Sequence, residues 1–363
     1  TNGFQVVSTD NFLNGSGDTM LYWAIAADPS TAATPTVTKS FDVVTYTGTG
    51  AAQNILSDIK ADFAWIKSTS HSTSWEMHDT VRNEPSRISS DSSSSDPATA
   101  NGFVEFIDGG FSLDSTGGGG EVNASGRTYQ ALLWSAGSHE GNLATANEQG
   151  SISSVTSVND ASGFSIVKYI GNGTNGATVG HGLSVKPEWI FIKNLDDSFG
   201  WIVYDTNVNS VGYLHLTDAF DTSRLSWGFN STAPTSTVVT LGYNGQAAVN
   251  GDGKAYIMYC FSSISQHSAV GSYTGQTSGV TVTTGFRPRL IIVKSTSNVE
   301  NWVVLTTDLG SGNALKANTN SDNDESSRNT FTVSDTGFSF PHQSTADAAL
   351  NENNYTYIYY AVK

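Results

Sequence analysis

Cysteine and long hydrophobic runs are almost missing from this chain of 363 residues. Cys260 is the single cysteine, so no disulfide can form within the chain. It lies in an apolar stretch, 256–261, where a buried thiol acts as a small hydrophobic side chain rather than as a nucleophile or a metal ligand. No apolar run approaches the length that spans a bilayer. The sequence therefore predicts neither a disulfide-stabilised protein nor a membrane partner.

Positive charge is also scarce. Lys and Arg total 17 against 33 Asp and Glu, which gives a formal net charge of -16, and no basic cluster occurs along the chain. Nucleic-acid binding needs a basic surface, because the phosphates must be neutralised. The composition thus argues against a nucleic-acid partner, and we interpret the acidity as a source of solubility.

Helical signals are few, whereas signals of strands and turns are frequent. Charged residues make up only 14% of the chain and glycine occurs 36 times. Short runs of β-branched and aromatic residues are separated by Gly, Asn and Ser, a pattern typical of strands joined by tight turns. Residues 51–59 are compatible with a single helical turn at most. The sequence predicts an all-β protein of antiparallel sheets.

Five landmarks recur three times at matched spacing. In each copy a lysine that ends an apolar run stands eight residues before a tryptophan. These pairs are Lys67 and Trp75, Lys193 and Trp201, and Lys294 and Trp302. An aliphatic residue follows each tryptophan (Ile88, Leu214, Leu315), a Tyr-x-Gly turn begins each unit (Tyr46, Tyr169, Tyr273), and an aromatic strand ends it (Tyr129, Tyr256, Tyr357). Because such self-similarity marks structural modules, each unit is expected to fold around its own core.

The repeat divides the chain into six parts. They are the C-terminal half of an incomplete module at 1–28, a linker at 29–40, module 1 at 41–135, a connector at 136–162, module 2 at 163–262 and module 3 at 263–363. The connector is expected to carry at most one short strand, at 151–158. Each module is predicted to be an antiparallel β-sandwich of the jelly-roll or lectin-like kind.

The N-terminal half-module has an apolar face that needs a cover. Its side chains are Phe4, Val6, Leu21 and Trp23. An isolated hairpin with such a face is marginal in water, and its edges invite pairing. We therefore predict that a neighbouring subunit or upstream sequence completes it, and that the protein works as an oligomer or filament.

Module 2 carries a more specific signature. It reads Tyr-Ile-Gly-Asn-Gly at 169–173, Gly-His-Gly-Leu at 180–183 and Pro-Glu-Trp-Ile-Phe-Ile-Lys at 187–193. This resembles an uncharacterised tandem β-module of marine phage and bacterial proteins, whose pattern is Tyr-Thr-Gly-Asn-Gly, Gly-His-Gly-Leu and Pro-Glu-Trp-Ile-x-x-Lys. Module 3 keeps part of the pattern and module 1 only its skeleton. The resemblance implies a virion-associated or tail-fibre-like protein, extracellular or on the virion, among neighbouring virion subunits, and it brings no catalytic residue.

Aromatic residues supply the candidates for ligand binding. Trp75, Trp201 and Trp302 could stack on sugars, but their fixed place at the start of a strand favours core anchors. Four less regular aromatic residues lie near loops and are better candidates for carbohydrate recognition on a host surface. They are Tyr213, Trp227, Tyr243 and Trp134.

Acidic residues and histidines give weaker signals. Asp322, Asp324 and Glu325 crowd one loop and offer oxygen ligands for Ca²⁺, although the twelve-residue calcium loop is absent; no other cofactor is expected. His181 has no second His or Cys at ligand spacing, so a structural role is favoured.

The segment 75–79 invites comparison with glycosidases, which use two carboxylates. Glu76 and His78 share one face of a strand while Asp79 points to the other, which is the wrong geometry for such a pair. The sequence therefore predicts a non-enzymatic structural protein, with a glycan-binding adhesin as the alternative and a glycoside hydrolase as the least favoured option.

Overall fold

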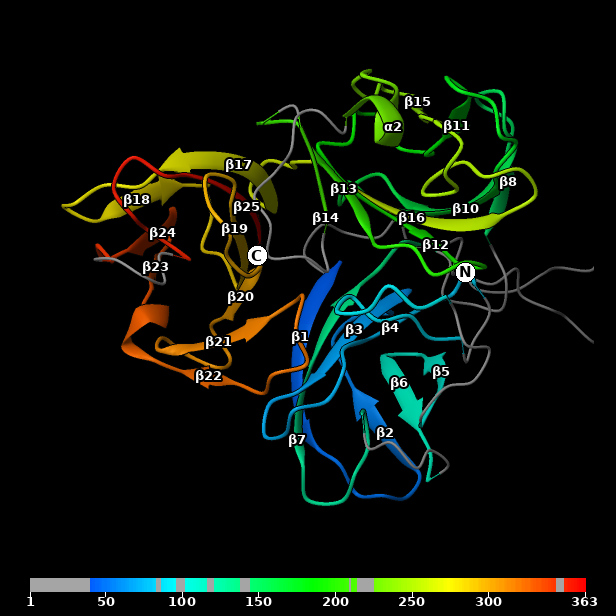
Figure 1. Ribbon diagram of the computed structural model, residues 1–363. Helices are drawn as coiled ribbons and strands as arrows, with labels where there is room; N and C mark the ends of the chain where they lie inside the picture. Colours follow the sequence, from blue (N-terminus) through cyan, green and yellow to red (C-terminus); the bar gives the residue numbers. More distant parts are fainter. Residues whose placement is uncertain are drawn as a thin grey trace, which may run out of the picture. The chain divides into compact units, whose positions relative to one another are not determined.

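Short antiparallel strands are the main regular secondary structure of the computed structural model (Figure 1). It describes residues 40–82, 86–95, 102–115, 121–137, 144–208, 210–213, 225–343 and 349–363. The predicted half-module at 1–28, and all but the last residue of the predicted linker, lie outside these residues. The predicted all-β class, with antiparallel sheets packed as sandwiches, is confirmed.

Module 1 consists of a larger and a smaller sheet. The larger has the strand order β1 (Phe41–Thr47), β7 (Thr128–Trp134), β3 (Phe63–Ser68) and β4 (Glu76–Asp79). The smaller has the order β2 (Gln53–Leu56), β6 (Gly110–Leu113) and β5 (Phe103–Ile107). Within residues 51–59, where the sequence allowed a helical turn, residues 53–56 thus form a strand, and Ile55 packs into the core between the sheets.

Module 2 has the same plan with additions. Its larger sheet has the order β14 (Ser210–Tyr213), β13 (Ile202–Asp205), β12 (Trp189–Asn194), β16 (Ala255–Phe261), β10 (Phe164–Ile170), β9 (Ser154–Asn159) and β8 (Thr145–Asn147). A pair of strands, β11 (Thr178–Gly180) and β15 (Val238–Thr240), and the helix α2 (Leu225–Phe229) complete it. The segment 136–162, predicted to be a connector, therefore adds two strands to this sheet: β9 pairs with β10, and β8 pairs with β9.

Module 3 again has two sheets. The larger has the order β17 (Ser268–Thr274), β25 (Thr356–Val362), β19 (Leu290–Ser295), β20 (Val303–Thr306), β21 (Asn313–Lys316) and β22 (Asp324–Glu325). The smaller has the order β18 (Val280–Thr283), β24 (Gly337–Phe340) and β23 (Thr332–Ser334), and a short 3-10 helix, η3 (Ser327–Asn329), lies between β22 and β23.

A tyrosine pair closes one end of each module. In module 2 the rings of Tyr169 and Tyr256 stack with centroids 5.1 Å apart, and the Tyr169 hydroxyl donates to the carbonyl oxygen of Val249 at 2.7 Å. A Cβ at Gly171, in the Tyr-x-Gly turn, would collide with the backbone of Gly251. Equivalent stacked pairs are Tyr46 with Tyr129 and Tyr273 with Tyr357. The recurring turn is thus explained by close backbone packing that only glycine allows.

A core shared by all three modules lies against the larger sheets. On β12, Ile190 and Ile192 point into the core of module 2, whereas Trp189 and Phe191 join a cluster to which every module contributes. In the larger sheets of modules 1 and 3, successive side chains of a strand likewise point alternately into the module's own core and into the shared core. Because both faces of these strands are buried, their sequences are unbroken apolar runs rather than alternating apolar and polar residues. The expectation that each unit folds around its own core was therefore incomplete.

Contacts between the modules close a ring. The Trp75 indole N–H of module 1 donates to the carbonyl oxygen of Lys316 in module 3 at 2.8 Å. The Trp201 indole of module 2 donates to the carbonyl oxygen of Ser89 in module 1, also at 2.8 Å. Trp302 of module 3 packs beside Trp189 of module 2, with ring centroids 5.9 Å apart. Each module therefore contacts both others, and the repeat does not extend as a line.

Candidate functional site

The tryptophan landmarks belong to the core. Trp75, Trp201 and Trp302 are 0%, 0% and 1% exposed, as their position in the repeat predicts. Trp134, which the sequence suggested as a surface aromatic, is also buried, and its indole N–H donates to the Tyr360 hydroxyl of module 3 at 3.3 Å. That suggestion was wrong because Trp134 is the last residue of β7 on the face turned to the shared core.

The lysine landmarks are buried as well. Lys193 Nζ donates to the carbonyl oxygens of Asn194 at 2.9 Å and Phe199 at 2.8 Å, and to Ser93 of module 1 at 3.2 Å. Lys67 and Lys294 likewise donate to backbone carbonyls of the loop that leads to the next strand. Burial lowers the pKa of Lys67 to about 8, against the opposing effect of nearby carboxylates. These ammonium groups hold loops in place, a role that the sequence did not indicate.

The charged strand of module 1 is enclosed. Glu76 and His78 share one face of β4, with the carboxylate Oε2 3.0 Å from the imidazole Nε2, and Arg87 binds the other carboxylate oxygen at 3.0 Å. Asp79 points to the opposite face, where Arg82 and the Tyr259 hydroxyl of module 2 donate to it. The predicted alternation is confirmed. Since Glu76, His78 and Asp79 are buried and hydrogen-bonded, they offer no site that a substrate can reach.

The acidic loop of module 3 does not gather its carboxylates. Asp324 and Glu325 are successive residues of β22, so they point to opposite faces. Asp324 pairs with Lys316 at 3.0 Å. The backbone N–H of Asn323 donates to Thr69 of module 1 at 3.2 Å, which fixes the stretch around Asp322 against that module. Among the described residues no group of three or more His, Cys, Asp and Glu side chains could hold a metal ion.

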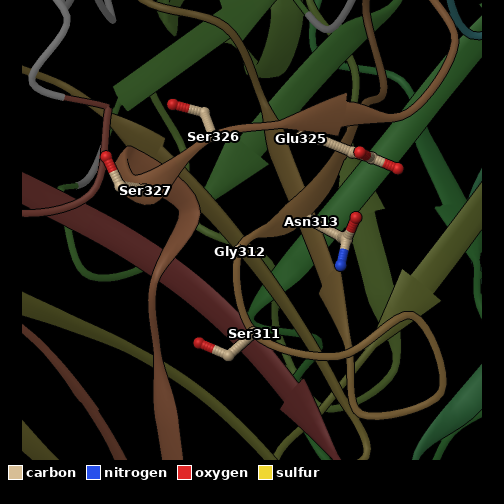
Figure 2. Close-up of a pocket in the computed structure, with 6 residues that line it drawn as sticks. All are labelled: Ser311, Gly312, Asn313, Glu325, Ser326 and Ser327. Atoms are coloured by element: carbon tan, nitrogen blue, oxygen red, sulfur yellow. The ribbon is translucent and has the colours of Figure 1, made fainter.

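A polar hollow of about 420 Å³ opens beside Glu325 (Figure 2). Figure 2 shows Glu325, Ser326 and Ser327 on one side of the hollow and Ser311, Gly312 and Asn313 on the other. The hydroxyls of Ser311 and Ser326 accept hydrogen bonds from backbone N–H groups and keep their own hydrogens to donate. The hollow thus offers hydroxyl donors and one carboxylate acceptor.

Two of the predicted aromatic residues lie on neighbouring backbone segments of module 2. Trp227 lies in α2 and Tyr243 in the loop after β15, and both are half-buried. The backbone N–H of Gly242 donates to the carbonyl oxygen of Gly228 at 3.2 Å, which joins the two segments. A Cβ at Gly242 would approach the Trp227 backbone to 2.5 Å, so only glycine allows this contact.

Two asparagines tie a third loop to this pair. The backbone N–H of Tyr243 donates to the Asn175 side chain at 2.8 Å, and the Asn175 amide donates to the Asn230 side-chain oxygen at 3.1 Å. We call residues 172–176, 225–231 and 241–246 the module 2 loop cluster. Neither asparagine was among the candidate residues from the sequence, and the positive φ of 50° at Asn230 marks a tight turn after α2.

Tyr213, the third predicted residue, is placed only by its backbone. It pairs with Ile202 at one end of β14, on the edge of the larger sheet. The side chains of β14 lie outside the described residues. From the predicted set, the structure thus joins only the backbone segments that carry Trp227 and Tyr243.

Comparisons with known proteins identify a family. A family model for a domain of unknown function (DUF7483) matches residues 36–363, which shows that the chain belongs to this family. The single model spans all three modules. No curated protein and no solved structure matched the chain. Within the described residues no helix is long and apolar enough to cross a membrane.

Proposed function

We propose that this member of the DUF7483 family is a non-enzymatic structural protein of an extracellular assembly, such as a phage tail fibre or another virion appendage. The ring of three modules around a shared core supports the proposal most directly, because the repeated landmarks serve packing and the loops differ from module to module. In such scaffolds, surface loops carry recognition. The module 2 signature, similar to modules of virion proteins, supports the same setting.

The absence of enzymatic activity is tested with polysaccharides. The purified chain is incubated with a panel of bacterial surface polysaccharides, and new reducing ends are measured over time. We expect none, and steady release of reducing ends would contradict the proposal.

Antibodies raised against the chain should label appendages of intact virions, and labelling confined to the host cytoplasm would count against a virion protein.

Self-association is part of the same proposal. The N-terminal segment 1–28 carries the apolar side chains of the predicted half-module, and we propose that a neighbouring subunit covers them. The oligomeric state of the chain is compared with and without residues 1–30 by light scattering. An oligomer that depends on the segment supports the proposal, whereas a monomer in both cases would overturn it.

Carbohydrate binding is a second candidate function, favoured by the module 2 loop cluster. Trp227 and Tyr243 lie on joined backbone segments, with the amides of Asn175 and Asn230 beside them. Aromatic rings pack against the apolar faces of sugars, while a few placed polar groups orient the hydroxyls. We propose that this cluster recognises host surface glycans.

A glycan array tests this second function. Wild-type protein is compared with Trp227→Ala and Tyr243→Ala, and with Tyr355→Ala, which removes a half-buried tyrosine of module 3 as a matched control. We expect the first two variants to lose about tenfold or more in affinity and the control to bind like wild type. Absence of glycan binding, or equal loss in all three variants, would remove the adhesin function and leave the structural one.

A further inference from the structure

The outer face of the smaller sheet in module 1 carries an exposed apolar pair. The strand register places Leu56 opposite Gly110 and Gly110 opposite Ile107, so all three lie on one face. Leu56 is 71% exposed, and Ile107 is half-buried. A Cβ at Gly110 would collide with the carbonyl oxygen of Ile55, so no side chain can stand between Leu56 and Ile107. The face is therefore apolar and open.

Module 3 carries exposed polar residues at the matched positions. There the register places Thr283 opposite Gly337 and Gly337 opposite Ser334. The glycine is thus retained, but the residues on either side of it are polar. A leucine and an isoleucine at the matched positions of module 1 are not required by the fold of the sheet.

Leu56 also lines a hollow of about 570 Å³ where module 1 meets module 3. The other lining residues are Asp42, Val43, Ser57, Asp58, Asp108, Gly109 and Arg289. Arg289 is fixed as part of the wall: it pairs with Asp42, and its guanidinium donates to Asp308 at 2.9 Å. We call this cavity, with Leu56 and Ile107 beside it, the module 1 hollow.

The rim of the module 1 hollow is negative. Asp58 is exposed and its carboxylate has no partner among the described residues, while its backbone N–H donates to Asp42 at 3.1 Å. Asp108 pairs with Lys60 at 3.3 Å, yet its side chain remains 80% exposed. No aromatic residue lines the cavity, so it lacks the stacking surface of a sugar site. An apolar wall between carboxylates is complementary to a cation carried on an aliphatic stem.

We propose that the module 1 hollow is a docking site for a basic peptide segment of a partner protein. The methylene groups of a Lys or Arg side chain lie along Leu56 and Ile107, and its charged end reaches Asp58 and Asp108. The net charge of -16 attracts such a partner from a distance. This surface is separate from the module 2 loop cluster, and its assignment does not rest on either function proposed above.

Fluorescence anisotropy with the full chain tests the docking site. The probe is a fluorescein-labelled peptide of sequence Lys-Leu-Lys-Leu-Lys, compared with Glu-Leu-Glu-Leu-Glu and Lys-Ser-Lys-Ser-Lys. We expect the first peptide to bind, the acidic peptide not to bind, and the serine peptide to bind about tenfold more weakly. Binding should weaken as salt is raised, because the rim charges are exposed.

Single substitutions test whether the peptide binds at the module 1 hollow. Leu56→Thr, which installs the residue of the matched module 3 position, should weaken binding of the first peptide about tenfold. Asp58→Asn should weaken it and reduce its salt dependence. Asp335→Asn, in the turn of module 3 that corresponds to Asp108, is the matched control and should bind like wild type.

The proposal is overturned by any of three results. They are no binding of the basic peptide at millimolar concentration, equal binding of the leucine and serine peptides, and unchanged affinity in both Leu56→Thr and Asp58→Asn. Both substitutions replace exposed side chains, and a thermal unfolding curve matching wild type shows that each variant is folded.

Discussion

Asp205 is expected to make the stability of this protein depend on pH. It ends β13, is 1% exposed, and lies on the face of the strand turned to the shared core. Its Oδ1 accepts hydrogen bonds from the backbone N–H of Asn207 at 2.8 Å and from the Asn207 side chain at 3.1 Å, but its Oδ2 has no partner in the described residues. At the matched position of module 1, Asp79 is paired with Arg82.

Burial raises the pKa of Asp205 from 3.8 to about 7, against the opposing effect of the hydrogen bonds from Asn207. Because the folded-state pKa lies above the unfolded one, the native state holds this proton more tightly. The group therefore destabilises the fold progressively as pH rises from about 4 to about 7. A difference of about 3 units between the folded-state and unfolded-state pKa corresponds to about 4 kcal/mol of unfolding free energy, at 1.36 kcal/mol per unit.

The variant Asp205→Asn removes this titration and keeps an oxygen that can accept from Asn207. An unpartnered amide in place of Oδ2 costs about 1–3 kcal/mol, but that cost is the same at every pH. Relative to wild type, the variant should therefore gain about 4 kcal/mol of unfolding free energy between pH 4 and pH 8.

Urea unfolding at pH 4, 6 and 8, followed by the fluorescence of the buried tryptophans, measures this gain. Asp335→Asn is the control, because its side chain is 96% exposed, and it should follow wild type at each pH. If the difference between Asp205→Asn and wild type is the same at pH 4 and pH 8, the reasoning about this buried carboxyl is refuted.

Three further substitutions or reactions test the packing. Lys193→Met leaves three carbonyl oxygens without their donor, including Ser93 of the neighbouring module, and should lower the unfolding free energy by about 3 kcal/mol in a denaturant titration. Gly171→Ala places a Cβ against the backbone of Gly251 and should lower the thermal midpoint by several degrees, whereas an unchanged midpoint would show that the turn can relax. Burial raises the pKa of Cys260 to about 12, so a thiol reagent should modify it only in denaturant; rapid modification of the native chain at neutral pH would contradict its burial.

The strands could be predicted from the sequence because their signals are local. The apolar run that ends in Lys193, with Pro187 before it, predicts β12 almost to its ends, and the repeat places β3 and β19 by the same landmarks. The shared core could not be predicted, because its contacts join distant parts of the chain. The bond from Trp75 to Lys316, for example, crosses 241 residues.

For the candidate sites, too, the sequence predicted local features but not contacts between distant segments. Their position near loops singled out Trp227 and Tyr243. Their segments, however, are joined by a backbone hydrogen bond between Gly228 and Gly242, which no local sequence pattern predicts. The prediction for Trp134 was wrong because a loop follows it in sequence, whereas in space its indole N–H reaches the Tyr360 hydroxyl of module 3. Local sequence patterns can predict which residue types suit a site, but they do not predict the contacts between distant segments that bury those residues.

Because the three modules of the ring lie on one chain, the ring does not dissociate on dilution, and the sequences of the three modules can diverge from one another. Three separate subunits with these interfaces would dissociate as their concentration fell, whereas modules on one chain face each other at a fixed effective concentration. A substitution in such a chain also appears once rather than three times. The residue at the position of Leu56 can therefore differ from Thr283, its counterpart in module 3, and one ring presents three chemically distinct faces to its surroundings.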